Sequence, residues 1–182
     1  AVCFPDTFAA GKKHIVTVGR LSREKGALLA LEACNMLREK QHDICLHWVG
    51  DGNQKTEIQE KICQLGLAEC FCLEGNQSNP YPYILNADIY VQPSFYEAYS
   101  TTVTEAKVLY RPIVATDVGG MRDQLVDGKT ALIVPVDASA IAEAIAHMLD
   151  EDGITLTFSD ALKQEHCQYA DALEEYERSV FA

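Results

Sequence analysis

Short, wholly apolar segments alternate with helical segments along most of the chain, and this alternation limits the possible folds more than any other feature. HIVTVG (14–19) is the first such segment and ICLHWVG (44–50) the second, and both stop at a glycine. The other predicted strands are 70–75, 88–94, 112–116 and 131–135. Strands that are apolar throughout are typical of parallel sheets covered on both faces. The sequence therefore predicts an α/β fold: a doubly wound, Rossmann-like parallel sheet of about six strands.

Helices are predicted between these strands, because apolar residues recur there at three- and four-residue spacing. Gly66 is expected at the C-cap of the helix that precedes it, and Asp137 at the N-cap of the helix that follows it. The predicted helices are 24–40, 54–66, 79–87, 102–110, one that begins after Asp137, and a tail helix at about 159–181.

The chain has 182 residues, enough for one well-packed core. It begins without Met, and we interpret it as part of a longer protein. We expect an interdomain junction remnant at 1–13, a Rossmann-like domain at 14–150, and a C-terminal helical tail of the same domain at 151–182. No apolar run approaches the roughly 20 residues that a membrane span requires.

The charge balance argues against nucleic acid as a partner. Fifteen Lys and Arg stand against 27 Asp and Glu, a formal net charge of −12, whereas binding to DNA or RNA relies on neutralising phosphates with cations. A few local cations can still serve a small anionic ligand. The composition therefore leaves small-molecule sites open while it excludes a general nucleic-acid surface.

Seven cysteines without a CxxC pair indicate reduced thiols and a cytoplasmic location. Cys70 and Cys72 stand two positions apart on a predicted strand and would face the same side. No further Cys or His follows them at the spacing that zinc sites show. We therefore predict no metal site.

A basic group follows the first predicted strand. Arg20, Arg23 and Lys25 come shortly after Gly19, where the strand exit meets the next helix. Ligands of doubly wound folds lie outside the carboxyl ends of the strands, and cations beside a helix N-terminus attract an anion there. Three charges in a turn are also common on ordinary surfaces, so a solvated basic turn stays an alternative at this point.

The segment PSFYEAYSTTVTEA (93–106) carries two glutamates on either side of a run of hydroxyl side chains. With a helix start near Thr102, Glu105 falls at the third helical position and the two residues fit a capping box. Alternatively, the N–H groups of Thr101 and Thr102 bind an anion, and Glu105 accepts hydrogen bonds from ligand hydroxyls. Glu97 lies before the helix, and capping does not explain it. Phosphate and sugar hydroxyls together are the groups of a nucleotide sugar.

Taken together, these motifs resemble the C-terminal domain of retaining glycosyltransferases of family 4, also called glycosyl transferases group 1, which have the GT-B fold. The resemblance covers about residues 14–150 and is carried by VGRLSREKG, WVGDG, LEGN, ADIYVQPSFYEAYSTTVTEAKVLYRPIVATDVGG and DGKTALIVP. It implies that the chain is one half of a GT-B enzyme. It also implies a donor-binding domain that acts in metal-independent transfer of a sugar from a nucleoside diphosphate to a glycan, lipid or other hydroxyl acceptor. No DxD motif is present, in keeping with metal independence.

The resemblance assigns roles to the matching positions. Arg20 and Lys25 would hold the diphosphate and stabilise the departing nucleoside diphosphate, Glu97 would contact the transferred sugar, and Glu105 would bind the ribose. The implied catalytic residues are Glu97, Arg20 and Lys25. The implied donor-binding residues are Gly19, Arg20, Lys25, Gly75, Asn76, Gln77, Glu97, Tyr99, Ser100, Thr101, Thr102 and Glu105, with no metal ligand and no cofactor.

Three departures from the family pattern bear on these roles. Ala98-Tyr99-Ser100 stands where many members have Gly-Phe-Gly, Asp123 where relatives often have Glu, and Tyr110 where a Gly is common. Because Ala and Ser have less backbone freedom than Gly, the path of this loop is the part of the site that the resemblance predicts least well.

The implied partners are a nucleotide sugar and an N-terminal acceptor-binding domain of the same enzyme, without which the chain should transfer little. The implied location is the cytoplasm. Alternatively, the missing domain would bring the protein to the cytoplasmic face of the membrane. Two alternatives stay open: a GT-B nucleotide-sugar epimerase or phosphorylase, and a non-catalytic nucleotide-binding module.

Overall fold

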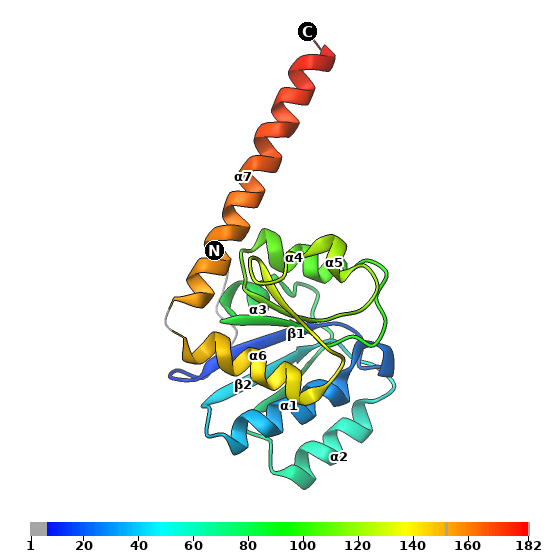
Figure 1. Cartoon of the computed structure of the whole chain (residues 1–182). Coiled ribbons are helices and arrows are strands. Elements are labelled where there is room, and N and C mark those ends of the chain that lie inside the picture. Colours follow the sequence, from blue (N-terminus) through cyan, green and yellow to red (C-terminus); the bar gives the residue numbers. More distant parts are fainter. Residues whose placement is uncertain (1–6, 152, 182) are drawn as a thin grey trace.

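The computed structural model of the chain describes residues 7–151 and 153–181 and contains one parallel sheet (Figure 1). Its strands are β1 (Lys13–Val18), β2 (Ile44–Val49), β3 (Phe71–Gly75), β4 (Ile89–Gln92), β5 (Ile113–Thr116) and β6 (Ala131–Val134). They are ordered β3-β2-β1-β4-β5-β6, and every neighbouring pair is parallel. The predicted doubly wound α/β fold with six strands is confirmed.

Two layers of helices cover the sheet. The helices are η1 (Arg23–Lys25, a 3-10 turn), α1 (Ala27–Glu39), α2 (Lys55–Leu65), α3 (Tyr81–Asn86), α4 (Thr101–Val108), α5 (Met121–Gln124), α6 (Ala138–Asp150) and α7 (Ile154–Phe181). α1, α2 and α6 enclose one apolar cluster that includes Leu31, Ile58 and Ile145. α3, α4 and α5 enclose the other, on the opposite face of the sheet (Figure 1). Buried on both faces, the strands need apolar residues at nearly every position.

Two predicted helix ends are confirmed and one predicted helix is interrupted. Gly66 is the C-cap of α2 with a φ of 65°, and the Asp137 side chain accepts a hydrogen bond from the Ala140 N–H at the start of α6. The predicted helix 24–40 is instead a 3-10 turn followed by α1, because Gly26 between them has a φ of 73°. A Cβ on Gly26 would lie 1.8 Å from the Pro93 carbonyl oxygen. This close approach brings η1 beside the loop that follows β4.

The last helix is longer than predicted. α7 begins at Ile154, five residues before the predicted start, and its far end leads away from the sheet (Figure 1). Its first part is held to the domain by the buried Leu162 and by an ion pair of 2.6 Å between Lys107 of α4 and Glu165. Among the residues that the structure describes, none of the helices has the length and apolar character needed to cross a bilayer.

The strand order places the ligand edge. β1 and β4 are neighbours, and the chain proceeds outward from them in opposite directions, to β2 and β3 on one side and to β5 and β6 on the other. The loops that leave β1 and β4 therefore diverge at the carboxyl edge of the sheet, which is where doubly wound folds bind ligands. These two loops carry Arg20, Lys25 and Glu97.

Candidate functional site

A cavity of about 360 Å³ lies at the carboxyl ends of β1, β2 and β3. It brings together four of the predicted donor-binding residues, Gly19, Arg20, Asn76 and Gln77. Gly75 borders it, since its carbonyl oxygen accepts a hydrogen bond from the Gly50 N–H. The cavity is lined by Val18, Gly19, Arg20, Val49, Gly50, Asp51, Asn76, Gln77 and Pro80.

Backbone-to-backbone contacts hold the wall of this cavity in place. Gly50 has a φ of 139°, and a Cβ there would lie 2.1 Å from the Gly19 carbonyl oxygen. A Cβ on Gly52 would lie 2.3 Å from the Leu21 carbonyl oxygen. Side chains at these two positions would push the β1 and β2 exit loops apart. The GDG segment is therefore a packing requirement of the cavity.

Lys25 and Glu97 meet at the adjacent exit of β4, although 72 positions separate them in the sequence. The Lys25 ammonium donates a hydrogen bond to Oε2 of Glu97 in a close ion pair. The Glu97 side chain is 11% exposed and that of Lys25 31%. Removing one partner of such a sheltered pair leaves the other charge uncompensated. The fold thus places two of the three predicted catalytic residues in contact, with Arg20 exposed on the same β1 loop.

A buried amide that the sequence reasoning missed lies beneath this pair. Gln92, at the end of β4, is 1% exposed and donates from Nε2 to the hydroxyl of Ser94 (2.8 Å) and to Glu97 (3.4 Å). Its Oε1 accepts from the hydroxyls of Tyr90 (3.0 Å) and Thr102 (3.3 Å). Both donor and both acceptor positions of the Gln92 amide are therefore engaged in hydrogen bonds. A glutamine at the end of an otherwise apolar strand was the available signal.

The capping box predicted for α4 is wrong. The N-cap is Ser100, and its side chain accepts a hydrogen bond from the Val103 N–H at 3.3 Å. Glu105 is thus the fifth residue of the helix, too far along to reach back to the N-cap N–H. Its carboxylate accepts a weak hydrogen bond from the Tyr81 hydroxyl at 3.4 Å instead. The carboxylate that the family resemblance assigns to a ligand is therefore not engaged in capping.

The cap assignment predicts different effects on stability for two replacements. Ser100→Ala should lower the free energy of unfolding by about 1 kcal/mol, because the Val103 N–H loses its partner. Glu105→Ala, which removes the only acceptor of the side chain, should change it by less than about 0.5 kcal/mol. Urea denaturation of both variants measures the difference. A loss on Glu105→Ala equal to that on Ser100→Ala would restore the capping role of Glu105.

Thr101 and Thr102 begin α4 beside the Lys25–Glu97 pair. Residues of the first helical turn have N–H groups without an intrahelical partner, and α4 points its N-terminal end at the loop that carries Glu97. The main-chain N–H groups at the start of α4 are therefore available as donors to an anion.

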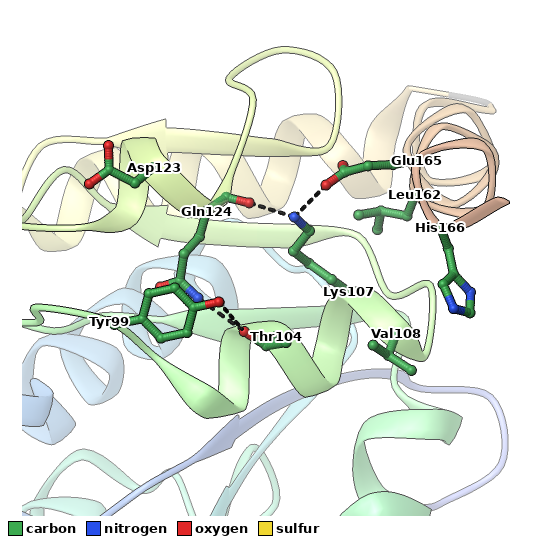
Figure 2. A pocket seen from close by; sticks show the side chains of 9 residues that line it. All are labelled: Tyr99, Thr104, Lys107, Val108, Asp123, Gln124, Leu162, Glu165 and His166. Carbon is green, nitrogen blue, oxygen red and sulfur yellow. Dashed lines mark hydrogen bonds and ion pairs between the residues drawn. The ribbon is translucent and has the colours of Figure 1, made fainter. Parts of the chain in front are cut away.

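Tyr99 is placed elsewhere. It is 63% exposed and lies over α4, where its hydroxyl accepts a hydrogen bond from the Thr104 hydroxyl at 3.4 Å (Figure 2). It lines a second hollow, of about 490 Å³, between α4, α5 and the start of α7. Lys107, Asp123 and Glu165 line the same hollow. Tyr99 thus lines this second hollow and not the cavity at Gly19.

A glycine pair supports the Glu97 loop from the side. The Gly120 N–H donates to the Glu97 carbonyl oxygen at 3.0 Å. Gly119 has a φ of 42°, and a Cβ there would lie 1.8 Å from the same oxygen. The loop after β5 therefore packs directly under the backbone of Glu97 and sets the direction of its side chain.

Comparison with curated proteins gives consistent matches. The chain is 28% identical over 176 residues to the 2-deoxystreptamine N-acetyl-D-glucosaminyltransferase of Niallia circulans. The matched region covers 91% of this chain and 45% of that protein. It is 32% identical over 136 residues to the D-inositol 3-phosphate glycosyltransferase of Paenarthrobacter aurescens, covering 71% of this chain and 32% of that protein. The chain thus spans less than half the length of these relatives.

Comparison with solved structures supports the fold. The C-terminal domain of a glycosyl transferase group 1 family protein from Francisella tularensis superposes with a TM-score of 0.76 at 23% identity, covering 86% of this chain and 87% of that one. The HepE protein of Anabaena, solved in complex with UDP-glucose, gives a TM-score of 0.79 at 22% identity, covering 87% of this chain and 45% of that one. The sheet described above is therefore the sheet of one GT-B domain.

The family assignment agrees with the geometry. The residues gathered at the carboxyl edge belong to the segments on which the resemblance rested, and the profile of the family described as glycosyl transferases group 1 matches residues 4–166. The chain belongs to the glycosyl transferases group 1 family.

Proposed function

We propose that this chain is the donor-binding domain of a retaining, metal-independent glycosyltransferase. It would bind a nucleoside diphosphate sugar and present it to an acceptor held by an N-terminal domain of the same protein. The observation that carries the proposal is the contact between Lys25 and Glu97 beside the cavity that Arg20 lines. A carboxylate for a sugar and two cations for a diphosphate thus meet at one edge of the sheet.

The arrangement divides the donor among three loops. The nucleoside occupies the cavity at Gly19, Asn76 and Gln77, and the ribose hydroxyls donate to Glu105. The diphosphate lies between Arg20, Lys25 and the first turn of α4, where main-chain N–H groups and cations favour anions. The sugar then extends toward Glu97. Each group of the donor meets the side chains whose chemistry fits it.

Catalysis in this proposal is electrostatic. As the bond between the sugar and the diphosphate breaks, negative charge grows on the leaving phosphate oxygen. Lys25 and Arg20 stabilise that charge, and they are already positioned before the reaction. Donor binding draws the Lys25 ammonium toward the phosphate and frees the Glu97 carboxylate for the sugar hydroxyls. Until the donor binds, the ion pair between Lys25 and Glu97 thus keeps both charges compensated.

Supporting features are found outside the site as well. These relatives are slightly more than twice as long as this chain, judged from the shares that it covers, and the additional length is enough for a second domain that binds the acceptor. HepE was solved with UDP-glucose, and UDP sugars are therefore the first donors to test. Five cysteines form no disulfide bond, which suits a reducing cytoplasm: Cys34, Cys45, Cys63, Cys70 and Cys72.

A non-catalytic nucleotide-binding module and a GT-B epimerase or phosphorylase are the competing functions. The first would need no carboxylate for a sugar, whereas Lys25 and Gln92 hold the Glu97 carboxylate at the exit of β4, where we propose that the sugar lies. The second would act without a hydroxyl acceptor. Product analysis of the full-length protein with a UDP sugar separates these functions, because only a transferase consumes an added acceptor.

Nucleoside diphosphates should stabilise the chain against heat. A ligand at a hundred times its Kd that binds only the native state contributes about 2.7 kcal/mol, which raises the Tm of a domain of this size by about 5–10 °C. Thermal shift with UDP, GDP and ADP measures the effect and identifies the base. No response to any of these at millimolar concentration would contradict the proposal.

Arg20→Ala and Lys25→Ala should each weaken the nucleoside diphosphate at least tenfold, because a hydrogen bond to a charged group contributes about 1.5–3 kcal/mol. Lys40→Ala is the charge-matched control. Lys40 is exposed at the end of α1, outside the residues that line the cavity. An equal loss of affinity in the control would mean that net charge, and not the site, governs binding.

A further inference from the structure

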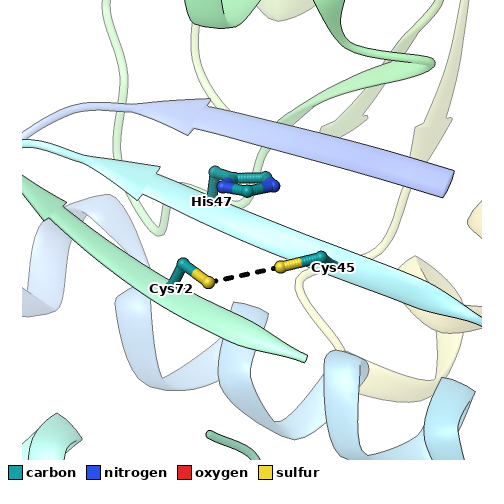
Figure 3. A group of neighbouring side chains, drawn as sticks. All are labelled: Cys45, His47 and Cys72. Atoms are coloured by element: carbon teal, nitrogen blue, oxygen red, sulfur yellow. Dashed lines mark hydrogen bonds between the residues drawn. The ribbon is translucent and has the colours of Figure 1, made fainter. Parts of the chain in front are cut away.

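Three side chains that could ligate a metal gather on β2 and β3, at a distance from the site described above. Sγ of Cys45 lies 3.3 Å from Sγ of Cys72, and the donor atoms of Cys45, His47 and Cys72 all lie within 4.8 Å of one another (Figure 3). We propose that Cys45, His47 and Cys72 form a binding site for a thiophilic divalent metal ion, with Zn²⁺ as the best match. The site is independent of the proposed sugar transfer.

The sheet register builds this cluster. Cys45 and His47 stand two positions apart on β2 and so face the same side of the sheet. Cys72 is the partner of His47 on β3. Cys45 and Cys72 are each the second residue of their strand, so the cluster lies toward the amino ends of the strands. The cavity at Gly19 lies at the carboxyl ends, and the two sites share no residue.

The distances are close to those of a metal site. Zinc binds thiolate at about 2.3 Å and imidazole at about 2.0–2.1 Å in a tetrahedral arrangement. Ligand atoms around one ion are then roughly 3.5–3.8 Å apart. The two sulfur atoms need to separate by about 0.5 Å and the imidazole to approach by about 1 Å. Side-chain rotations on an unchanged backbone supply movements of that size. Two thiolates and one imidazole are a ligand set typical of zinc.

His47 is oriented by a carboxylate, as metal-binding histidines usually are. Its Nδ1 lies 2.8 Å from Oε1 of Glu74, whose side chain is only 5% exposed. The other oxygen of this carboxylate accepts a hydrogen bond from the Tyr83 hydroxyl at 3.1 Å, which fixes the carboxylate against the imidazole. Nε2 of His47 lies 2.9 Å from Nδ1 of His14. We assign Nε2 to the ion, which replaces this contact when it binds.

The two thiols differ in their access to solvent. Cys45 is buried, whereas Cys72 is partly exposed and gives an ion a path of entry. Binding releases the thiol protons, and any proton on Nε2, to solvent. A water molecule on the side of Cys72 completes the fourth position.

The register disfavours a disulfide between the same two sulfurs. His47 is the residue opposite Cys72 on the neighbouring strand, and Cys45 lies two residues before His47. With strands about 4.8 Å apart and a rise of about 3.3 Å per residue, the two Cα atoms are roughly 8 Å apart. A disulfide requires a Cα separation below about 7 Å. The sulfurs can therefore share an ion without backbone movement, which a covalent bond would require.

Cobalt titration of the reduced chain tests the proposal. Co²⁺ should bind with one ion per chain and give near-ultraviolet thiolate-to-cobalt bands together with the visible bands of tetrahedral cobalt. One equivalent of Zn²⁺ should bleach both. Cys45→Ser and Cys72→Ser should each weaken cobalt binding at least tenfold, while Cys63→Ser, at an exposed thiol on α2, should leave it unchanged. Circular dichroism checks that each variant is folded.

X-ray absorption of the zinc-loaded native chain reads the ligands without any variant. The expected shell has two sulfur atoms and at least one imidazole nitrogen. The proposal is overturned if no thiolate-to-cobalt band forms, if the band survives Cys45→Ser or Cys72→Ser, or if the zinc shell lacks sulfur or imidazole. A quantitative Cys45–Cys72 disulfide in protein purified without reductant, with no cobalt bands after reduction, would overturn it too.

Discussion

Glu97→Gln in the longer protein that contains this domain is expected to reduce sugar transfer about a hundred- to thousandfold, the range seen when one preorganised electrostatic group is removed from an active site. The amide keeps the shape of the side chain but loses the charge that pairs with Lys25. Affinity for the nucleoside diphosphate alone should stay the same or increase, because Lys25 is no longer neutralised. Turnover with a UDP sugar, and calorimetry with UDP, measure the two effects separately.

The control for this variant is Glu69→Gln, which removes the same charge from an exposed position before β3. It should transfer sugar at the unaltered rate. If Glu97→Gln also transfers at that rate, Glu97 is not a catalytic residue. If both nucleotide affinity and transfer fall together while the protein stays folded, the ion pair serves diphosphate binding, and the role assigned to Glu97 at the sugar is wrong.

Gly119→Ala is expected to lower the free energy of unfolding by about 3 kcal/mol or more. Two costs combine: the left-handed φ of 42°, and a Cβ that would lie 1.8 Å from the Glu97 carbonyl oxygen. Because that oxygen belongs to rigid backbone, the loop must shift to accommodate the methyl group, and the Glu97 side chain shifts with it. Urea denaturation and nucleotide titration of the variant measure both consequences.

Gly128→Ala separates the two costs. Gly128 also has a left-handed φ, of 71°, but a Cβ at this position would meet no atom within 4 Å beyond its chain neighbours. This variant should therefore lose only the conformational cost, about 1 kcal/mol. Equal losses in the two variants would show that the contact with Glu97 adds nothing and that the loop after β5 does not position the site.

The fold could be predicted well because its signals are local. Each strand is mainly apolar and each is followed by a helix, so periodicity alone led to six parallel strands. Gly66 and Asp137 end and begin helices through bonds within a few residues, which is why both were predicted correctly. The capping box required Thr102 as the N-cap of α4, two residues after the observed N-cap Ser100, and this difference moves Glu105 from the third helical position to the fifth.

The site could be predicted only in part. The resemblance selected Arg20, Lys25 and Glu97, and the fold brings them to one edge. Gln92 was missed because its four partners come from β4, the following loop and α4. Tyr99 lies over α4 and not at the cavity, because a side chain on a loop takes its direction from tertiary contacts such as the one with Thr104.

The class of fold and the types of residue at the ligand edge follow from the amino-acid sequence, since both depend on hydrophobic periodicity and on which residues follow each strand. Which of those residues meet depends on how the strands are arranged in three dimensions. The pairing of Lys25 with Glu97 and the gathering of Cys45, His47 and Cys72 depend on strand order and register. These are set by contacts between segments far apart in the chain, and no local pattern of residues encodes them.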